Sequence, residues 1–390
     1  MIDTILIKVP YPNFAVTLYD MFQPNAKGLF HAPFLPFHGQ PFVKCVNNPT
    51  KADKEQGIYK PRLTVVKRVA KGGFGINLHI ELSLPKLMYG NNFDELKDSD
   101  LEEIRRLLSK QLLLMGVHVS KEHLLDAPVY AVHYSKNIAF DDYTTSSLIL
   151  NSLEKIKLNA QIDLNATDFR NQGEAVRYYA KSHEFVCYDK VADLNKSKDR
   201  ATEKEDREYN LQTDIFEAIR NEGTPFEVLR LELRLKSRPK MKKLFEKLGI
   251  ENDLTFASLF SQRLSQKLLQ NQWKTIYDEL IPVLLQALDT PEQFELIARQ
   301  QNKYTPTRVL AMTALCAMIR EEGHRKVRGR IKARFSDRTM QRLYKDIKEL
   351  DFKVLNRAAP FDHITQSLKD FVPLRSEQFS VSLSHTPLTV

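Results

Sequence analysis

Two stretches of strictly alternating apolar and polar residues limit the fold of this chain more than any other feature. They are residues 78–82, with the sequence LHIEL, and residues 229–236, with the sequence LRLELRLK. Successive side chains of a β-strand point to opposite faces, so this alternation predicts strands with one apolar and one polar face. The polar residues are His79 and Glu81 in the first stretch and Arg230, Glu232, Arg234 and Lys236 in the second. A sheet face with carboxylates, cations and a histidine has the side chains needed for metal-assisted phosphoryl transfer.

The rest of the pattern places these strands in an α+β domain. Strands are predicted at 62–69, 76–84, 129–141, 175–181, 183–190 and 227–237, and helices at 99–115, 144–158 and 210–221. After Pro239 helical patterns follow at 240–248, 254–270, 271–288, 291–301, 305–322 and 336–349. We therefore expect an α+β domain with an irregular N-terminal part at residues 1–238, and a helical region at residues 239–390.

The positive charge of the chain is concentrated in one segment. The net charge is +9, and residues 303–348 hold 13 Lys and Arg against 4 Asp and Glu, so the remainder is neutral. Such a segment is typical of a module that binds nucleic acid, although a solvated basic helix has the same composition. Two helices joined by a basic turn at 325–334 predict a helix-turn-helix-like element at about 303–350. The cations assigned to DNA here are Arg325, Lys326, Arg328, Arg330, Lys332, Arg334, Arg338 and Arg342.

Three further features bear on the compartment. No run of about 18 apolar residues is present, so no membrane partner is expected. The N-terminus lacks the basic start and apolar core of a signal peptide. Cys45, Cys187 and Cys316 lie far apart and form no CxxC pair. This cysteine usage favours the reducing cytoplasm over a disulfide framework.

His79, Glu81 and Glu232 form the candidate metal site. In an extended strand His79 and Glu81 point to the same face about 6.5–7 Å apart, so both can contact one cation if another strand supplies further ligands. Glu232, on the second alternating strand, is a further carboxylate. An oxygen-rich set with one imidazole favours Mg²⁺ or Mn²⁺. The alternative is that these residues are ordinary solvent-facing positions of a sheet covered on one side.

Tyr188 is the candidate nucleophile, and Lys190 is its partner. Both lie on one face of the strand predicted at 183–190, where a nearby ammonium lowers the pKa of a phenol and offsets phosphate charge. Attack of a tyrosinate on a metal-polarised phosphodiester would give a covalent phosphotyrosine and a free 3′-hydroxyl. Tyr178 and Tyr179, on the preceding strand, are rival nucleophiles.

The strand predicted at 129–141 offers further polar side chains. His133, Ser135 and Asn137 share one of its faces. His133 is either a metal ligand or a hydrogen-bonded structural histidine. Asn137 is not assigned to the metal, because an amide is a poorer ligand than a carboxylate.

Several short motifs follow one another along the chain in a recognisable order. They are the start MID, HIELSLPK at 79–86, VCYDK at 186–190, LRLELRLKSR at 229–238 and FVPL at 371–374. This order, together with the chain length, resembles the gene II replication-initiation endonucleases of filamentous phages. Residues 138–142, IAFDD, are similar to a strand end of plasmid rolling-circle initiators.

The resemblance implies a fold and residue roles. The fold would be an RRM-like antiparallel sheet of the HUH-endonuclease type, followed by a helical DNA-binding region. The family's Tyr-x-Lys motif matches Tyr188 and Lys190, and its Arg-x-Glu motif matches Arg230 and Glu232. The carboxylate that the family carries on a strand matches Glu81. His79 matches half of a His-hydrophobe-His metal motif, whose second position is Glu81 here.

The resemblance also implies a reaction. Such enzymes nick one DNA strand at an origin, stay attached through a tyrosine, leave a 3′-hydroxyl primer for rolling-circle replication and rejoin the displaced strand. We therefore expect a replication endonuclease in the cytoplasm of a bacterial host. Its partners would be double- and single-stranded origin DNA and the host replication helicase and polymerase, with Arg230 and Arg234 contacting DNA at the sheet. A conjugative relaxase and a non-catalytic DNA-binding repressor on the same scaffold are the alternatives.

Overall fold

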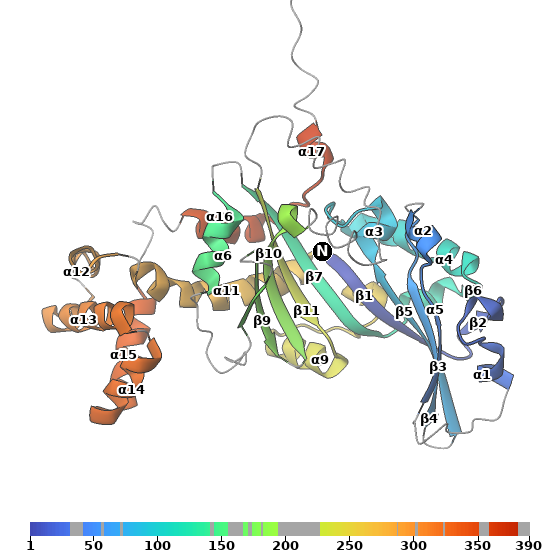
Figure 1. The fold of residues 1–390 in the computed structure, drawn as a ribbon, viewed down its shortest axis with the longest axis horizontal. Coiled ribbons are helices and arrows are strands. Elements are labelled where there is room, and N and C mark those ends of the chain that lie inside the picture. Colours follow the sequence, from blue (N-terminus) through green and yellow to red (C-terminus); the bar gives the residue numbers. More distant parts are fainter. Residues whose placement is uncertain are drawn as a thin grey trace, which may run out of the picture.

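The computed structural model of this chain describes thirteen segments (Figure 1). They are residues 1–31, 42–55, 58–70, 73–140, 144–154, 167–170, 174–180, 182–193, 227–286, 288–300, 303–322, 324–350 and 359–380. The helix expected at 210–221 lies outside the described residues.

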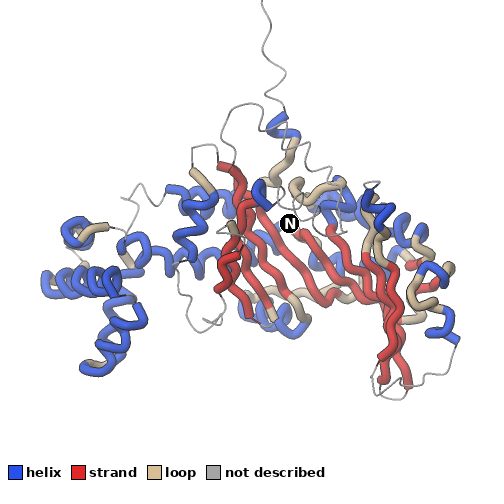
Figure 2. Tube along the Cα trace, in the orientation of Figure 1, coloured by secondary structure: helices blue, strands red, loops and turns tan. Residues whose placement is uncertain are grey.

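In the part of the chain that the structure describes, a nine-stranded antiparallel sheet lies at the centre and confirms the α+β class. Its strands, in spatial order, are β3 (Phe42–Asn47), β4 (Arg62–Ala70), β5 (Gly73–Ser83), β1 (Ile2–Pro10), β7 (Val129–Phe140), β11 (Glu227–Leu235), β10 (His183–Asp189), β9 (Ala175–Ala180) and β8 (Thr167–Arg170). A separate pair joins β2 (Phe14–Val16) to β6 (Val117–Val119). Figure 2 shows the strands lying side by side across the molecule. Both alternating stretches are therefore strands, as the sequence predicts.

Helices cover one face of this sheet. The helix α11 (Gln262–Gln286) packs on β7 and β11, α6 (Ser146–Glu154) packs on β9 and β10, and α16 (Ala359–Asp370) packs on β7. In Figure 1, α11 runs behind these strands. The leucines of β11 point into this core, because Leu229, Leu231, Leu233 and Leu235 are all buried there. The polar side chains of the same strand are thereby directed to the opposite face.

Further helices complete the part of the chain around the sheet. They are η1 (Tyr19–Met21), α1 (Lys27–His31), α2 (Lys51–Glu55), α3 (Leu84–Tyr89), η3 (Asp98–Asp100), α4 (Leu101–Leu114), α5 (Lys121–Leu125), α9 (Arg238–Lys247), α10 (Phe256–Leu259) and α17 (Glu377–Ser380). Buried residues of α4, α9 and α10 belong to the same core as the sheet. The core of the sheet therefore extends beyond residue 238 and takes in the first helices of the region expected to be separate.

Four helices form a second hydrophobic core. They are α12 (Thr290–Ala298), α13 (Pro306–Glu322), α14 (His324–Arg334) and α15 (Asp337–Lys348). Ile297, Met312, Leu315 and Ile347 are buried among them. Figure 2 shows these helices at one end of the molecule, beyond the sheet. The segment 325–334, expected as a basic turn, is helix α14, so the predicted helix-turn-helix arrangement is corrected to three successive helices.

Within the described residues, no helix is long and apolar enough to cross a membrane.

Candidate metal and tyrosine site

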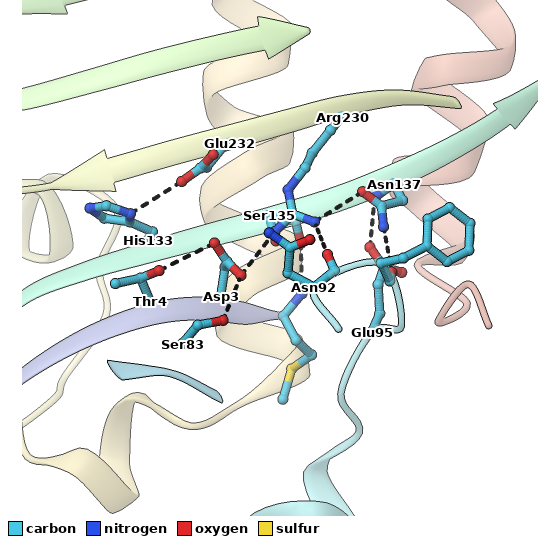
Figure 3. Close-up of polar contacts among 12 residues, drawn as sticks. Asp3, Thr4, Ser83, Asn92, Glu95, His133, Ser135, Asn137, Arg230 and Glu232 are labelled. Atoms are coloured by element: carbon cyan, nitrogen blue, oxygen red, sulfur yellow. Dashed lines mark hydrogen bonds and ion pairs between the residues drawn. The ribbon is translucent and has the colours of Figure 1, made fainter. Parts of the chain in front are cut away.

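Three neighbouring strands bring two carboxylates and an imidazole together on the polar face of the sheet. Asp3 lies on β1, His133 on β7 and Glu232 on β11, and one ligand atom from each lies within 4.8 Å of the others. Asp3 and Glu232 are almost fully buried, and His133 is partly buried. Figure 3 shows the three side chains converging from their strands. This set offers the oxygen and imidazole donors that suit Mg²⁺ or Mn²⁺.

The register of the sheet explains why these residues meet. Arg234 on β11 pairs with His133 on β7, and Glu232 pairs with Ser135, so both carboxylate and imidazole face the same side. The pairing of β1 with β7 shifts between Ile2 and Ile5, and Asp3 lies within this irregularity. Bulges of this kind redirect side chains. Asp3 thereby reaches the polar face from a strand that is otherwise largely apolar.

Glu232 is held ionised by its neighbours. His133 Nδ1 lies 3.1 Å from one carboxylate oxygen, and Arg234 donates to both oxygens at 3.0 Å. Burial alone would raise the pKa of Glu232, but the hydrogen bond from His133 and the charge of Arg234 hold that pKa well below its ordinary value. An ionised carboxylate is the form that ligates a cation, so the site is prepared for metal without a change in protonation.

Arg230 lies beneath the metal cluster instead of on its surface. Its guanidinium lies 3.2 Å from Asp3 and donates to Ser135 Oγ at 2.9 Å and to the Asn92 carbonyl at 2.6 Å. Only 1% of the residue is exposed. The expectation that Arg230 contacts DNA is therefore corrected, because the guanidinium is buried and both of its terminal nitrogens already donate to protein acceptors. Its role in this structure is to position Asp3 and the Asn92 loop.

Tyr188 lies next to the cluster. Its hydroxyl lies 3.5 Å from Glu232 Oε2, on a strand next to that of Glu232. Burial raises the pKa of Tyr188 above its ordinary value, while the nearby charge of Arg230 opposes that shift. The sequence had led us to expect a lowered pKa, and the structure shows the opposite because desolvation dominates. A cation at the cluster would act in the same direction as Arg230 and favour the tyrosinate.

Lys190 accompanies Tyr188 on the same side of the sheet. Its ammonium lies 5.9 Å from the centre of the Tyr188 ring and donates to Asn92 Oδ1 at 2.8 Å. The side chain is fully buried, and burial together with the charge of Arg230 lowers the pKa of Lys190 to about 8. This amine can therefore exchange a proton near neutral pH.

The two rival tyrosines lie elsewhere. The Tyr178 hydroxyl donates to the Leu153 carbonyl at 2.6 Å, and the side chain belongs to the core. Tyr179 lies under the Arg177 guanidinium, which is 4.7 Å from its ring centre. Its strand, β9, is separated from β11 by β10. Tyr188 is thus the one of the three that the structure places beside Glu232.

His79 and Glu81 do not join this cluster. Both lie on β5, and β1 and β7 separate β5 from β11. Three strand spacings amount to about 14 Å, so neither side chain can share one ion with Glu232. Glu81 lies 3.7 Å from Arg62, and the pKa of His79 is lowered to about 4 by burial and by the charges of Lys8 and Arg68. Asp3 and His133 occupy the places that the sequence analysis gave to His79 and Glu81.

The predicted DNA-binding cations are divided between two regions. Arg234 is partly buried on the sheet and is paired with Glu232 and Glu184. On the terminal helices, Arg330, Lys332, Arg334, Arg338 and Arg342 are exposed. Arg325, Lys326 and Arg328 lie in helix α14, and their side chains lie outside the described residues.

Comparison of the chain with protein families, with curated proteins and with solved structures found no match.

Proposed function

We propose that this protein is a metal-dependent DNA-nicking and -joining endonuclease that starts rolling-circle replication. The observation that carries the proposal is the contact between the Tyr188 hydroxyl and Glu232, at 3.5 Å, within a cluster of two carboxylates and an imidazole. A nucleophile beside a group of metal ligands is the arrangement that phosphoryl transfer to a side chain requires. The motif order that resembles phage initiators supports the choice of DNA.

Each residue has a role in the proposed reaction. Asp3, His133 and Glu232 would hold a Mg²⁺ or Mn²⁺ ion, which supplies charge stabilisation to the phosphodiester. Tyr188 Oη forms a bond to phosphorus as the bond from phosphorus to the 3′-oxygen breaks. The neutral amine of Lys190 takes the phenol proton, and the resulting ammonium returns a proton to the departing 3′-oxygen. The products are a 5′-phosphotyrosine and a 3′-hydroxyl, and reversal of these steps rejoins a strand.

Covalent trapping tests this proposal. A random-sequence single-stranded DNA pool labelled at the 3′ end is incubated with the full chain and Mn²⁺, and adducts are resolved in denaturing gels. We expect the wild type to form a labelled adduct and Tyr188→Phe to form none. Tyr179→Phe is the matched control and should retain the adduct. An adduct that survives in Tyr188→Phe would show that another group is the nucleophile, and DNA binding without any wild-type adduct would favour the non-catalytic alternative.

Metal binding is tested separately from activity. Titration calorimetry with Mn²⁺ alone should show one site in the wild type and at least a tenfold loss of affinity in Glu232→Gln and His133→Gln, because each removes one ligand. Glu81→Gln is the control and should bind Mn²⁺ like the wild type, since Glu81 lies on β5, about 14 Å from β11. Equal loss in Glu81→Gln would return the metal site to β5.

A further inference from the structure

A cavity of about 550 Å³ opens beside the metal and tyrosine site. Residues from β1, β4, β5 and α3 line it, together with parts of the loops that precede β4 and follow α3. Its volume falls within the range of roughly 300–1,000 Å³ found for small-ligand sites, which suits one nucleotide and excludes a duplex.

The cavity is continuous with the reacting centre. Asp3, a member of the metal cluster, forms part of its wall, and so does Asn92. Asn92 accepts hydrogen bonds from Arg230 through its carbonyl and from Lys190 through its side chain. A strand whose phosphate reached Asp3 and Tyr188 would therefore bring its next nucleotide to the mouth of the cavity.

The lining has the chemistry of a nucleotide site. Lys60, Arg62 and Lys86 supply positive charge for a phosphate, and Tyr59 supplies an aromatic ring of the kind on which bases stack. The polar groups of Asn48 and Ser83 add hydrogen-bonding capacity. A lining that combines cations, an aromatic ring and amide or hydroxyl groups matches the three parts of a nucleotide better than it matches an apolar ligand.

Glu81 gives the cavity a preference among the bases. Half of its side chain is exposed, and Arg62 lies 3.7 Å from its carboxylate, beyond hydrogen-bond distance. The carboxylate oxygens can accept hydrogen bonds from an exocyclic amine, which cytosine, adenine and guanine carry. Thymine has no exocyclic amine and presents carbonyl oxygens at C2 and C4, which the carboxylate repels.

We propose that this cavity binds one unstacked nucleotide of the DNA strand, adjacent to the phosphodiester that Tyr188 attacks, and that Glu81 selects a base with an exocyclic amine there, against thymine. This inference rests on the proposed function. It gives Glu81 a role in choosing the cleavage position in place of the metal-binding role expected from the sequence.

Abasic scanning of a bound oligonucleotide tests the inference. A sequence enriched from a random single-stranded DNA pool by the full-length protein, in the presence of EDTA, is resynthesised with one abasic site at each position in turn. We expect a loss of about tenfold or more in affinity at one position beside the adduct, occupied by cytosine, adenine or guanine and not by thymine. In Glu81→Gln the abasic penalty at that position should fall to about twofold, while the penalties elsewhere stay as in the wild type.

A matched control separates local recognition from charge loss. Glu103→Gln is this control. Glu103 is a surface carboxylate that forms an ion pair with Arg106, in the same way that Glu81 forms one with Arg62. Glu103 lies on α4 and does not line the cavity. The abasic profile of Glu103→Gln should equal that of the wild type. The cavity proposal is overturned, and the proposed function stands, if the covalent adduct forms but every abasic site lowers the affinity equally. The same conclusion follows if Glu81→Gln has the same loss of affinity at each abasic position as the wild type. If no adduct forms and no DNA binds, both are overturned.

Discussion

Arg230 and Glu232, two residues apart on β11, are both almost fully buried, at 1% and 2% exposure. An isolated charge in such a position is strongly unfavourable, and the charges of Arg230 and Glu232 are each compensated by neighbouring polar or charged groups. Asp3, Ser135 and Asn92 surround Arg230, whereas His133 and Arg234 surround Glu232. These contacts fix the side chains before any ligand binds. We infer that the geometry of the candidate metal site is preorganised, as the proposed phosphoryl transfer would require.

Lys190 predicts a dependence of stability on pH. Its pKa is about 8 in the folded chain, against an ordinary value of 10.5. Between these values the unfolded chain binds more protons than the folded one, so the lysine contributes stability that rises as pH increases from 8 towards 10.5. Below pH 8 the buried ammonium is a net cost of up to about 3 kcal/mol.

Lys190→Met removes this dependence. In urea unfolding, the stability of the variant relative to the wild type should be highest below pH 8 and should fall by up to about 3 kcal/mol by pH 10. Lys110→Met, at an exposed position of α4, serves as the control and should keep a constant difference from the wild type. A constant difference in Lys190→Met would contradict the burial of a titrating amine at this site.

The sequence identified part of the candidate site. Glu232, Tyr188 and Lys190 stand out because alternation in a strand assigns polar residues to one face without knowledge of the fold. Asp3 is the one carboxylate in the largely apolar segment Ile2–Pro10, and this isolated charge is the sequence feature that indicates a functional role for Asp3. The sequence indicates His133 as a possible metal ligand, but it does not indicate which other ligands lie beside it. The choice requires the order of strands, which local patterns do not contain.

At the scale of elements, the place of β1 in the strand order determines which polar side chains lie next to Glu232. Most of the ranges predicted from local periodicity agree with the described elements to within a few residues. The helices predicted at 254–270 and 271–288 are an exception, because α11 (Gln262–Gln286) runs without interruption through the predicted break and α10 (Phe256–Leu259) precedes it. The insertion of β1 between β5 and β7 is a long-range pairing, and it moves His79 and Glu81 away from Glu232. The helix α14 was missed for another reason. Its run of cations, with a glycine at 329, has little apolar periodicity, so its helical state depends on packing of Val327 in the second core.

The exposed cations of α14 and α15 predict a salt-dependent contact with duplex DNA. Replacing Arg334, Arg338 and Arg342 with Gln should weaken binding and reduce the slope of log affinity against log salt by about 2–3, since each phosphate contact contributes about 0.9. Fluorescence anisotropy with a random-sequence duplex between low and moderate salt measures this slope.

Three exposed lysines on other helices provide a charge-matched control for this experiment. Lys110, Lys242 and Lys267 lie on α4, α9 and α11, helices whose buried residues belong to the core of the sheet. Their combined change to Gln removes the same formal charge and should leave the slope close to that of the wild type. Equal effects of the two triple variants would indicate that net charge, and not a surface on α14 and α15, attracts the duplex.

At the scale of the molecule, the described residues form two hydrophobic cores, each of which supports a different candidate site. The larger core supports the sheet and the metal and tyrosine site, and the smaller core holds α12, α13, α14 and α15 together. Because the smaller core contains far fewer buried residues, we expect it to open at a lower free energy than the sheet. Hydrogen exchange should then show faster opening of α13 than of β7 and β11.

A pair of cavity-forming variants tests this separation. Leu315 is buried in the smaller core and Leu231 in the larger one, so each change to Ala removes the same three carbon atoms and should cost about 2–5 kcal/mol locally. Leu315→Ala should accelerate exchange in α12–α15 and weaken duplex binding, while Mn²⁺ affinity measured by calorimetry remains that of the wild type. Leu231→Ala lies next to Glu232 on β11 and should weaken Mn²⁺ binding instead. If Leu315→Ala lowered Mn²⁺ affinity as much as Leu231→Ala did, the two cores would have to unfold as one cooperative unit, and the metal site would depend on the terminal helices.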